Sequence, residues 1–368
     1  MKRRDFLKAG PAAAAAGAFT AASTVAMPAI AQSAPEIRWR MTSSFPKPLD
    51  ALFGNAEMFA KLVAEATDNK FQIQCFGPGE IVPALQALDA AQNGTVECAH
   101  TPIYFYTGKE TALAFGTGVP FSFNSRLQYA WLVNGGGNAL MDEALAKFNV
   151  VGLPCGQSGT QMGGWFRREI NKPEDWKGLK FRIGGLGGDV LARLGVVPQQ
   201  IAGGDIYPAL ERGTIDAAEF VSPYDDEKLG FARVAKYYYA PGFWEGGAML
   251  HMVVNREKWE SLPKPYQAIM RQAADASMNA MLAKYDAFNG PALKRLVGTG
   301  TELRIFPNAV LDSAWTVAHE LYHEMAAKNP LFKRALESMI AFRTENYLWW
   351  QVNEYAFDSL MIRNRTRV

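Results

Sequence analysis

Residues 36–43 read EIRWRMTS, with apolar Ile37, Trp39 and Met41 alternating with Arg38 and Arg40. This period of two predicts a strand with one buried face. Four further segments follow with alternating helix and strand signals: helix NAEMFAKLVAEATDN (55–69), strand KFQIQCF (70–76), helix PALQALDAAQNG (83–94) and strand TVECAH (95–100). Together they predict a βαβαβ unit with right-handed crossovers, in an open α/β lobe that binds ligands at the carboxyl ends of its strands.

A second lobe is predicted to begin near Leu153. Strand signals recur in GGWFRREI (163–170) and in LKFRI (179–183), where Arg182 leaves the apolar face of its strand. The glycine cluster at 184–188 invites a dinucleotide-binding interpretation, but its third glycine would stand at Val190, so the spacing is wrong. A chain of 368 residues, 49% of them hydrophobic, is also long enough for two domains.

The charge balance argues against nucleic acid as a partner. The formal net charge is only +2, and basic and acidic residues are interspersed beyond the N-terminus. Nucleic-acid binders instead carry a clustered basic face.

The N-terminus resembles a cleavable export signal over residues 1–31. RRDFLK (3–8) precedes an alanine-rich apolar run, and AIA (29–31) supplies small residues for cleavage. The paired Arg3 and Arg4 resemble the twin-arginine type of signal. We expect a periplasmic mature protein, and an uncleaved membrane anchor is the alternative.

The cysteines Cys75, Cys98 and Cys155 are far apart, and no two of them form a CxxC motif. Neither a zinc cluster nor a disulfide framework is indicated, and at least one of the three must be unpaired. We expect all three to be buried as small apolar residues, with a single disulfide as the alternative.

Several longer segments are informative together: DWKGLKFRI (175–183), LARLGVVP (191–198), IYPALERGTIDAAE (206–219) and YYYAPGFWEGG (237–247), with GPGEIVPALQALDAAQNGTVECAH (77–100) and YTGKE (106–110) in the first lobe. They resemble one family, the solute-binding proteins of tripartite ATP-independent periplasmic (TRAP) transporters. The resemblance extends through nearly all of the mature chain. It is strongest to the branch that takes small 2-oxo or 2-hydroxy acids.

The resemblance implies an α/β, two-lobed periplasmic binding protein fold, with mixed sheets flanked by helices, a hinge cleft and long C-terminal helices. We place lobe I at 32–152 plus 246–288, lobe II at 153–245 plus 289–308, and the C-terminal helices at 309–368. The implied function is a receptor, not an enzyme. It would capture a small monocarboxylate such as pyruvate, 2-oxobutyrate or lactate together with a cation, and deliver it to TRAP membrane subunits.

The family's site residues carry over onto matching positions. Arg182 matches the arginine that grips the substrate carboxylate, and a guanidinium can form two parallel charge-assisted hydrogen bonds there. Gln161, Glu219, Glu245 and the backbone carbonyl of Phe220 match the cation ligands. An all-oxygen set suits a hard cation such as Na+ or Ca2+. Arg182, two glutamates and a monocarboxylate sum to −2, so the identity of the cation stays open.

Other substrate contacts are predicted less directly. Thr160 takes a place where some relatives have asparagine, and Tyr104 and Tyr106 are candidates to donate a hydrogen bond to the acid's keto or hydroxyl oxygen. Phe220 stands where the family pattern has tryptophan. That change affects the volume of the pocket but not a backbone ligand.

An alternative function comes from HELYH at 319–323, which matches the H-E-x-x-H pattern of zinc metalloproteases. His319 and His323 would bind zinc from one helical face while Glu320 acts as general base. A third ligand would have to be Glu337 or Glu345, beyond a break at Pro330. Otherwise these histidines belong to a structural helix.

The C-terminal stretch from about 330 to 363 has a helical pattern and is dense in aromatic residues. They lie at too many helical angles for one buried stripe. Long C-terminal helices make dimers in the 2-oxo-acid branch, so the resemblance implies a homodimer. Packing wholly within one chain is the alternative.

Overall fold

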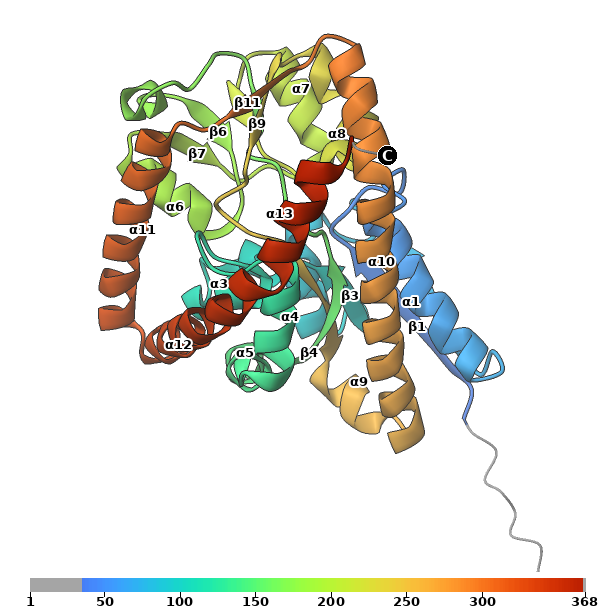
Figure 1. The fold of residues 1–368 in the computed structure, drawn as a ribbon. Helices are drawn as coiled ribbons and strands as arrows, with labels where there is room; N and C mark the ends of the chain where they lie inside the picture. Colours follow the sequence, from blue (N-terminus) through green and yellow to red (C-terminus); the bar gives the residue numbers. More distant parts are fainter. Residues whose placement is uncertain (1–34, 367–368) are drawn as a thin grey trace, which may run out of the picture. The chain divides into compact units, whose positions relative to one another are not determined.

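The computed structural model describes residues 35–366. The predicted export signal at 1–31, with its twin-arginine pair, lies outside the described residues. A first sheet has five strands in the order β2-β1-β3-β10-β4, of which Figure 1 labels β1, β3 and β4. Its strands are β1 Ile37–Ser43, β2 Phe71–Phe76, β3 Cys98–Thr101, β4 Val150–Gln157 and β10 Met249–Asn255.

The predicted βαβαβ unit is present. β1 pairs in parallel with β2 and with β3, and α1 (Leu52–Ala66) and α2 (Ala87–Gln92) connect them. The later strand β10 is antiparallel to both β3 and β4, so the sheet is mixed. Apolar side chains of β1 and α1 pack in one buried cluster, as the two sequence periods predict.

A second sheet has six strands in the order β11-β9-β5-β8-β6-β7. Parallel and antiparallel pairs both occur in it. Its strands are β5 Gly164–Phe166, β6 Lys180–Arg182, β7 Val197–Gln199, β8 Ala217–Ala218, β9 Tyr237–Ala240 and β11 Glu302–Ile305. The two mixed sheets flanked by helices confirm the predicted fold class.

The remaining helices lie around these sheets and differ greatly in length. They are α3 Ala114–Thr117, α4 Ser125–Asn134, α5 Gly137–Ala146, α6 Gly185–Arg193, α7 Ile206–Glu211, α8 Pro223–Leu229, α9 Arg256–Ser261, α10 Lys264–Gly298, α11 Asn308–Lys328, α12 Pro330–Val352 and α13 Glu354–Asn364. Single 3-10 turns occur at Ala84–Gln86, Ile103–Tyr106, Thr111–Leu113, Pro173–Trp176, Gly203–Asp205 and Phe231–Arg233.

The chain passes between the two sheets after β4, after β9 and again between β10 and β11, where α10 makes the connection. β4 pairs with β10 as far as Gln157, so the lobe boundary predicted at Leu153 falls inside a strand of the first sheet. Helix α10 contacts α1 and β4 with one part and α8 with another, and it carries Pro291 in its interior. The three described cysteines are unpaired, and Cys98 and Cys155 are fully buried. Cys75 is only partly buried, so the expectation that all three are buried is wrong for Cys75. Among the described helices, none combines the length and apolarity that crossing a bilayer needs.

Candidate functional site: a buried arginine among oxygen ligands

A small cavity lies where several strands end. β1 leads into Phe45, β4 into Ser158, β6 ends at Arg182 and β8 leads into Phe220. Strand ends of this kind are the usual ligand site in open α/β folds. The full lining is Phe45, Leu52, Pro102, Tyr104, Phe105, Ser158, Gln161, Arg182, Phe220, Val221, Ala248 and Leu250. The cavity measures about 20 Å³, room for about one water molecule, so this arrangement is a closed one.

Arg182 lies at the end of β6 with only 2% of its surface exposed. Its Nη1 donates to Oε1 of Glu219 at 2.6 Å and also to the Glu219 carbonyl, while its Nε donates to the carbonyl of Ile201 at 3.0 Å. Nη2 has no acceptor among the described residues. A carboxylate can therefore approach Nη2, but a bidentate pair with the guanidinium also requires Nη1 to release the Glu219 carboxylate.

The two glutamates are buried and incompletely partnered. Glu219 and Glu245 are 1% and 2% exposed, and Oε2 of each lacks a hydrogen-bond partner. Burial raises the pKa of Glu245 well above its usual range, and the charge of Glu219 raises it further. Burial also raises the pKa of Glu219, although Arg182 opposes that shift. A bound cation would give both unpaired carboxylate oxygens a partner and would offset the repulsion between the two carboxylates.

Gln161 follows β4 and is 3% exposed. With its amide nitrogen donating to Ser158 Oγ at 2.9 Å, its oxygen faces the Glu245 carboxylate and the Phe220 carbonyl. With the amide rotated, the nitrogen donates to Glu245 Oε1 at 3.0 Å and to the Phe220 carbonyl at 3.3 Å. The first orientation brings three oxygens together, which is favourable only around a cation. The second satisfies the amide without one.

The three other residues predicted to contact the substrate lie in three different places. Tyr104 lines the cavity, and its hydroxyl donates to Glu245 Oε1 at 3.5 Å. The structure does not bring Tyr106 there, because its hydroxyl is held in the core by Thr101 Oγ1 and by the amide of Leu88. Thr160 is exposed outside the cavity, where its hydroxyl donates to the carbonyl of Gly246 at 3.1 Å.

Sequence reasoning missed Ser158, which joins two segments of the site. Its hydroxyl contacts the Gln161 amide and accepts from the backbone amide of Ala248 at 2.8 Å. Phe45 and Leu52 were also missed, although both follow the carboxyl end of β1. The rule that ligands bind at such strand ends could have identified them.

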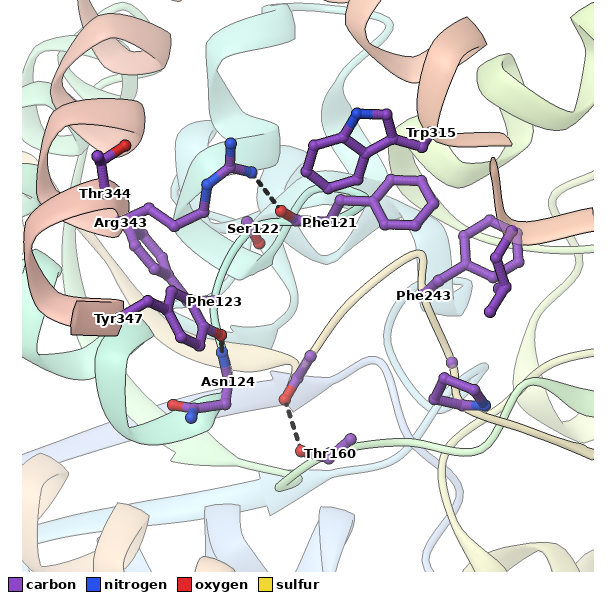
Figure 2. A pocket seen from close by; sticks show the side chains of 14 residues that line it. Phe121, Ser122, Phe123, Asn124, Thr160, Phe243, Trp315, Arg343, Thr344 and Tyr347 are labelled. Atoms are coloured by element: carbon purple, nitrogen blue, oxygen red, sulfur yellow. Dashed lines mark hydrogen bonds between the residues drawn. The ribbon is translucent and has the colours of Figure 1, made fainter. Parts of the chain in front are cut away.

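A larger cavity of about 550 Å³ lies beside the segments that connect the sheets (Figure 2). Thr160 opens onto it, and its lining includes the aromatic side chains of Phe121, Phe123, Phe243, Trp315 and Tyr347. Arg343 of α12 reaches across it to donate to the carbonyl of Phe121 at 2.6 Å. The cavity therefore connects the C-terminal helices with the backbone next to the small cavity.

The HELYH segment lies on α11, as predicted, but it does not form a zinc site. The Nδ1 of His319 is 2.8 Å from the carbonyl of Trp315, and the two rings are in contact. Glu337, one of the two candidate third ligands, lies 3.8 Å from the Lys333 ammonium on α12. Within residues 35–366, three or more His, Cys, Asp or Glu side chains come together nowhere as a candidate metal site. The metalloprotease alternative thus lacks its third ligand.

Comparison with known proteins decides the family. The model of the bacterial extracellular solute-binding protein family 7 matches residues 42–329. The chain belongs to this family. Its members are solute-binding receptors and not enzymes, and the predicted resemblance to TRAP solute-binding proteins is confirmed. Membership of a periplasmic family also supports the periplasmic location.

Three relatives of this family 7 chain are informative. The monocarboxylate 2-oxoacid-binding periplasmic protein of a Nostoc species is 47% identical over 98% of both chains. A TRAP transporter solute-binding protein from Bordetella bronchiseptica is 47% identical and superimposes with a TM-score of 0.89, over 90% of this chain and 99% of the Bordetella chain. That protein is a mixed-occupancy dimer with calcium and picolinate in one site. A Pseudoalteromonas atlantica relative with bound sodium and pyruvate is 34% identical, with a TM-score of 0.86 over 88% and 99%.

Proposed function

We propose that this protein is a periplasmic receptor that captures a small 2-oxo or 2-hydroxy monocarboxylate together with Na+ or Ca2+, and delivers it to a TRAP membrane transporter. One observation carries the proposal. Arg182 is buried in an enclosed cavity beside two carboxylates, an amide and a backbone carbonyl. The relatives that bind pyruvate with sodium, or picolinate with calcium, support the same ligand classes.

Arg182 is the proposed carboxylate anchor. In the closed arrangement its Nη1 is paired with Glu219. A cation beside Glu219 and Glu245 would supply positive charge that compensates both carboxylates. Arg182 could then turn Nη1 and Nη2 toward the acid, since planar two-pronged pairing suits a guanidinium.

Gln161 and Phe220 are the proposed neutral oxygen ligands. In the orientation in which its nitrogen donates to Ser158, the Gln161 amide would present its oxygen to the cation together with the Phe220 carbonyl and the Glu245 carboxylate. Ser158 can accept or donate, so it satisfies the amide in either orientation. Tyr104, whose hydroxyl lies 3.5 Å from Glu245 Oε1, is the proposed donor to the keto or hydroxyl oxygen of the acid.

Capture requires the two walls of the cavity to separate and close again, because about 20 Å³ does not admit a 2-oxo acid. Closure removes water and strengthens each ionic contact inside. The closed form then differs from the open one, so a membrane partner can recognise the loaded receptor.

We further propose a homodimer formed through the C-terminal helices. Several large apolar side chains of α12 and α13 are more than half exposed: Leu348, Trp349, Val352, Tyr355, Phe357, Met361 and Ile362. Exposed apolar patches of this kind commonly mark interfaces. Tyr347, which directly precedes the first of them on α12, lines the cavity of about 550 Å³ (Figure 2). We also keep the expectation of export by the twin-arginine route.

Isothermal titration calorimetry on chelator-treated mature protein tests the receptor function. Pyruvate is expected to bind when Na+ or Ca2+ is present, and Arg182→Met to abolish the binding. Glu320→Gln, in the HELYH segment, is the control and is expected to bind like the wild type. Binding lost in Glu320→Gln but retained in Arg182→Met would contradict the proposal.

A further inference from the structure

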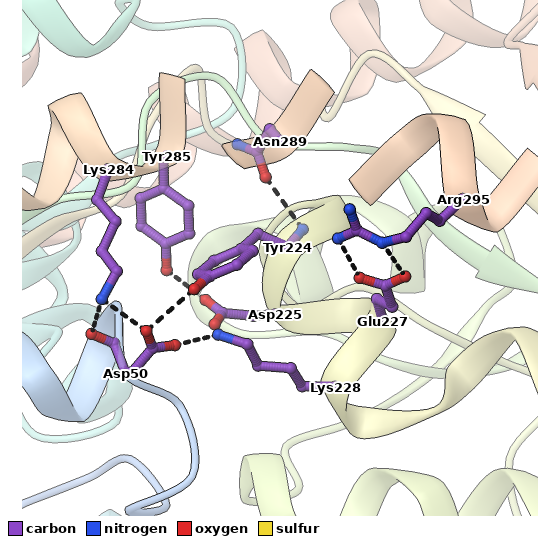
Figure 3. Close-up of polar contacts among 9 residues, drawn as sticks. All are labelled: Asp50, Tyr224, Asp225, Glu227, Lys228, Lys284, Tyr285, Asn289 and Arg295. Carbon is purple, nitrogen blue, oxygen red and sulfur yellow. Dashed lines mark hydrogen bonds and ion pairs between the residues drawn. The ribbon is translucent and has the colours of Figure 1, made fainter. Parts of the chain in front are cut away.

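Asp50 receives donors from two separate helices (Figure 3). Lys228 of α8 forms an ion pair with its carboxylate, and the Tyr224 hydroxyl of the same helix donates to Oδ2 at 3.0 Å. Lys284 of α10 lies 2.6 Å from Oδ2 and also donates to the Asp50 carbonyl at 2.7 Å. Burial raises the pKa of Asp50, but these contacts outweigh it and hold the pKa well below its usual range.

Asp50 belongs to one wall of the acid cavity. It lies in the segment 45–52 that follows β1, and both ends of this segment, Phe45 and Leu52, line the cavity. Leu49 and Leu52 pack in an apolar cluster that also contains Phe220 and Val221. The Asp50 contacts therefore lie at the edge of an apolar contact between segment 45–52 and the opposite wall.

Helix α8 is joined to that opposite wall by chain continuity and by hydrogen bonds. It begins at Pro223, directly after the wall residues Phe220 and Val221. The Asp226 carboxylate accepts from the Val221 amide at 3.4 Å, and also from the Tyr238 hydroxyl at 2.7 Å. The Val221 carbonyl accepts from the amide of Met162, next to Gln161. Movement of α8 would therefore also move the segments that hold the proposed cation ligands.

Helix α8 is attached to α10 without the help of Asp50. Arg295 and Glu227 form a two-pronged ion pair at 2.8 and 2.7 Å, and Asn289 Oδ1 accepts from the Tyr224 amide at 3.1 Å (Figure 3). These contacts do not involve segment 45–52. Asp50 is the residue that joins segment 45–52 to α8 and α10 through charged contacts.

We propose that Asp50 is a positioning residue that latches segment 45–52 to α8 and so keeps the acid cavity closed. The inference rests on the proposed receptor function for its consequence, which is slow release of the acid. It predicts that loss of the Asp50 charge loosens both walls while the fold of each stays intact.

The first test needs no ligand. Hydrogen–deuterium exchange is measured on peptides covering 45–52 and 219–222 in the acid-free protein. Asp50→Asn is expected to speed exchange in both by roughly fivefold, the scale of a few exposed charged contacts. Glu227→Gln is the matched control, since it breaks a similar ion pair of the same helix. Unchanged exchange in Asp50→Asn, or equal acceleration in Glu227→Gln, overturns the latch.

The second test is the dissociation rate of pyruvate, measured by stopped-flow mixing with excess chelator after loading with Ca2+. Asp50→Asn is expected to release pyruvate roughly five to ten times faster, and Glu227→Gln within twofold of the wild type. High salt should speed the wild type more than Asp50→Asn, because salt screens exposed charges. Rates that are equal in Asp50→Asn and the wild type contradict the latch.

A further variant, and the ligand-free test made first, distinguish a failure of the latch from a failure of the receptor function. If Asp50→Asn does not fold, Lys228→Met removes one latch contact and is expected to accelerate exchange roughly threefold; exchange equal to that of the wild type overturns the latch. If the wild type binds no pyruvate, the receptor proposal fails. The ligand-free exchange comparison still decides whether Asp50 holds the walls together.

Discussion

Arg182 and Glu219 form an ion pair inside the protein, with Nη1 and Oε1 2.6 Å apart and both side chains at most 3% exposed. Arg182 ends β6 and Glu219 directly follows the neighbouring strand β8, and the amide of Glu219 donates to the carbonyl of Arg182. The pair is therefore fixed by the sheet. Two charges held out of water in this way depend on each other, because either one alone would be left buried and uncompensated.

Replacing Arg182 should affect stability as well as binding. Arg182→Met is expected to lower the free energy of unfolding by about 3 kcal/mol, since Glu219 loses its counter-charge. The double variant Arg182→Met/Glu219→Gln should lose less than the single one. Urea unfolding at neutral pH measures both. A double variant less stable than Arg182→Met would show that the pairing is not the cause.

Gln161 should control the choice of cation. Gln161→Leu removes the amide oxygen and is expected to weaken cation binding by at least tenfold while leaving the fold intact. Gln161→Glu adds a third carboxylate and should favour Ca2+ over Na+, because added ligand charge favours the divalent ion. Calorimetric titration with each cation, at fixed pyruvate, measures the change. Equal affinity of Gln161→Leu and the wild type would remove Gln161 from the site.

Two buried histidines should each contribute less to stability in mild acid. Burial lowers the pKa of His100 to about 4 and that of His251 to about 3, the latter also because of His100. An unfolded histidine titrates near 6.5, so below that pH the unfolded chain binds protons first. The contribution of each neutral histidine is complete above pH 6.5 and is lost as the pH falls. For His251 the loss at pH 5 is about 2 kcal/mol.

The comparison with a variant isolates this effect. Burial raises the pKa of Asp225 to about 6 and that of Asp226 to about 7, so these carboxyls give the opposite dependence. Their contribution cancels when His251→Gln is compared with the wild type. Between pH 7.5 and 5, the free energy of unfolding of the wild type should fall by about 2 kcal/mol relative to that of the variant. Parallel curves would show that His251 does not titrate on unfolding.

The proposed dimer can be disrupted without touching the acid site. Trp349 and Phe357 are more than 60% exposed on α12 and α13. Trp349→Glu/Phe357→Glu is expected to convert dimers to monomers in sedimentation velocity, because burying two charges at an apolar interface is unfavourable. Pyruvate affinity should stay within about threefold. A wild type that sediments as a monomer at micromolar concentration would contradict the dimer.

Local patterns predicted much of the fold. The alternation in Ile37, Trp39 and Met41 and the helical period after it gave the first βαβ unit correctly, because one sheet face and one helix stripe are buried there. Helix α10 was not predicted as one element. Its 35 residues contact different partners along their length, so the apolar side changes and no single stripe persists.

The site was predicted unevenly. The alternation around Arg182 showed that it leaves the apolar face, but it could not distinguish solvent from a closed cavity. The resemblance, not the pattern, brought Arg182, Gln161, Glu219 and Glu245 together. Tyr104 and Tyr106 are two residues apart, yet only the first reaches the cavity, because the 3-10 turn Ile103–Tyr106 directs their side chains to different places.

The central claim is that the acid and a cation occupy one site held by Arg182. The most direct test is calorimetric titration of pyruvate into chelator-treated mature protein, first without added metal and then with Na+ or Ca2+. We predict no measurable binding without a cation, binding with one, and none in Arg182→Met under any condition. Pyruvate binding of equal strength with and without cations, or retained in Arg182→Met, would contradict the account.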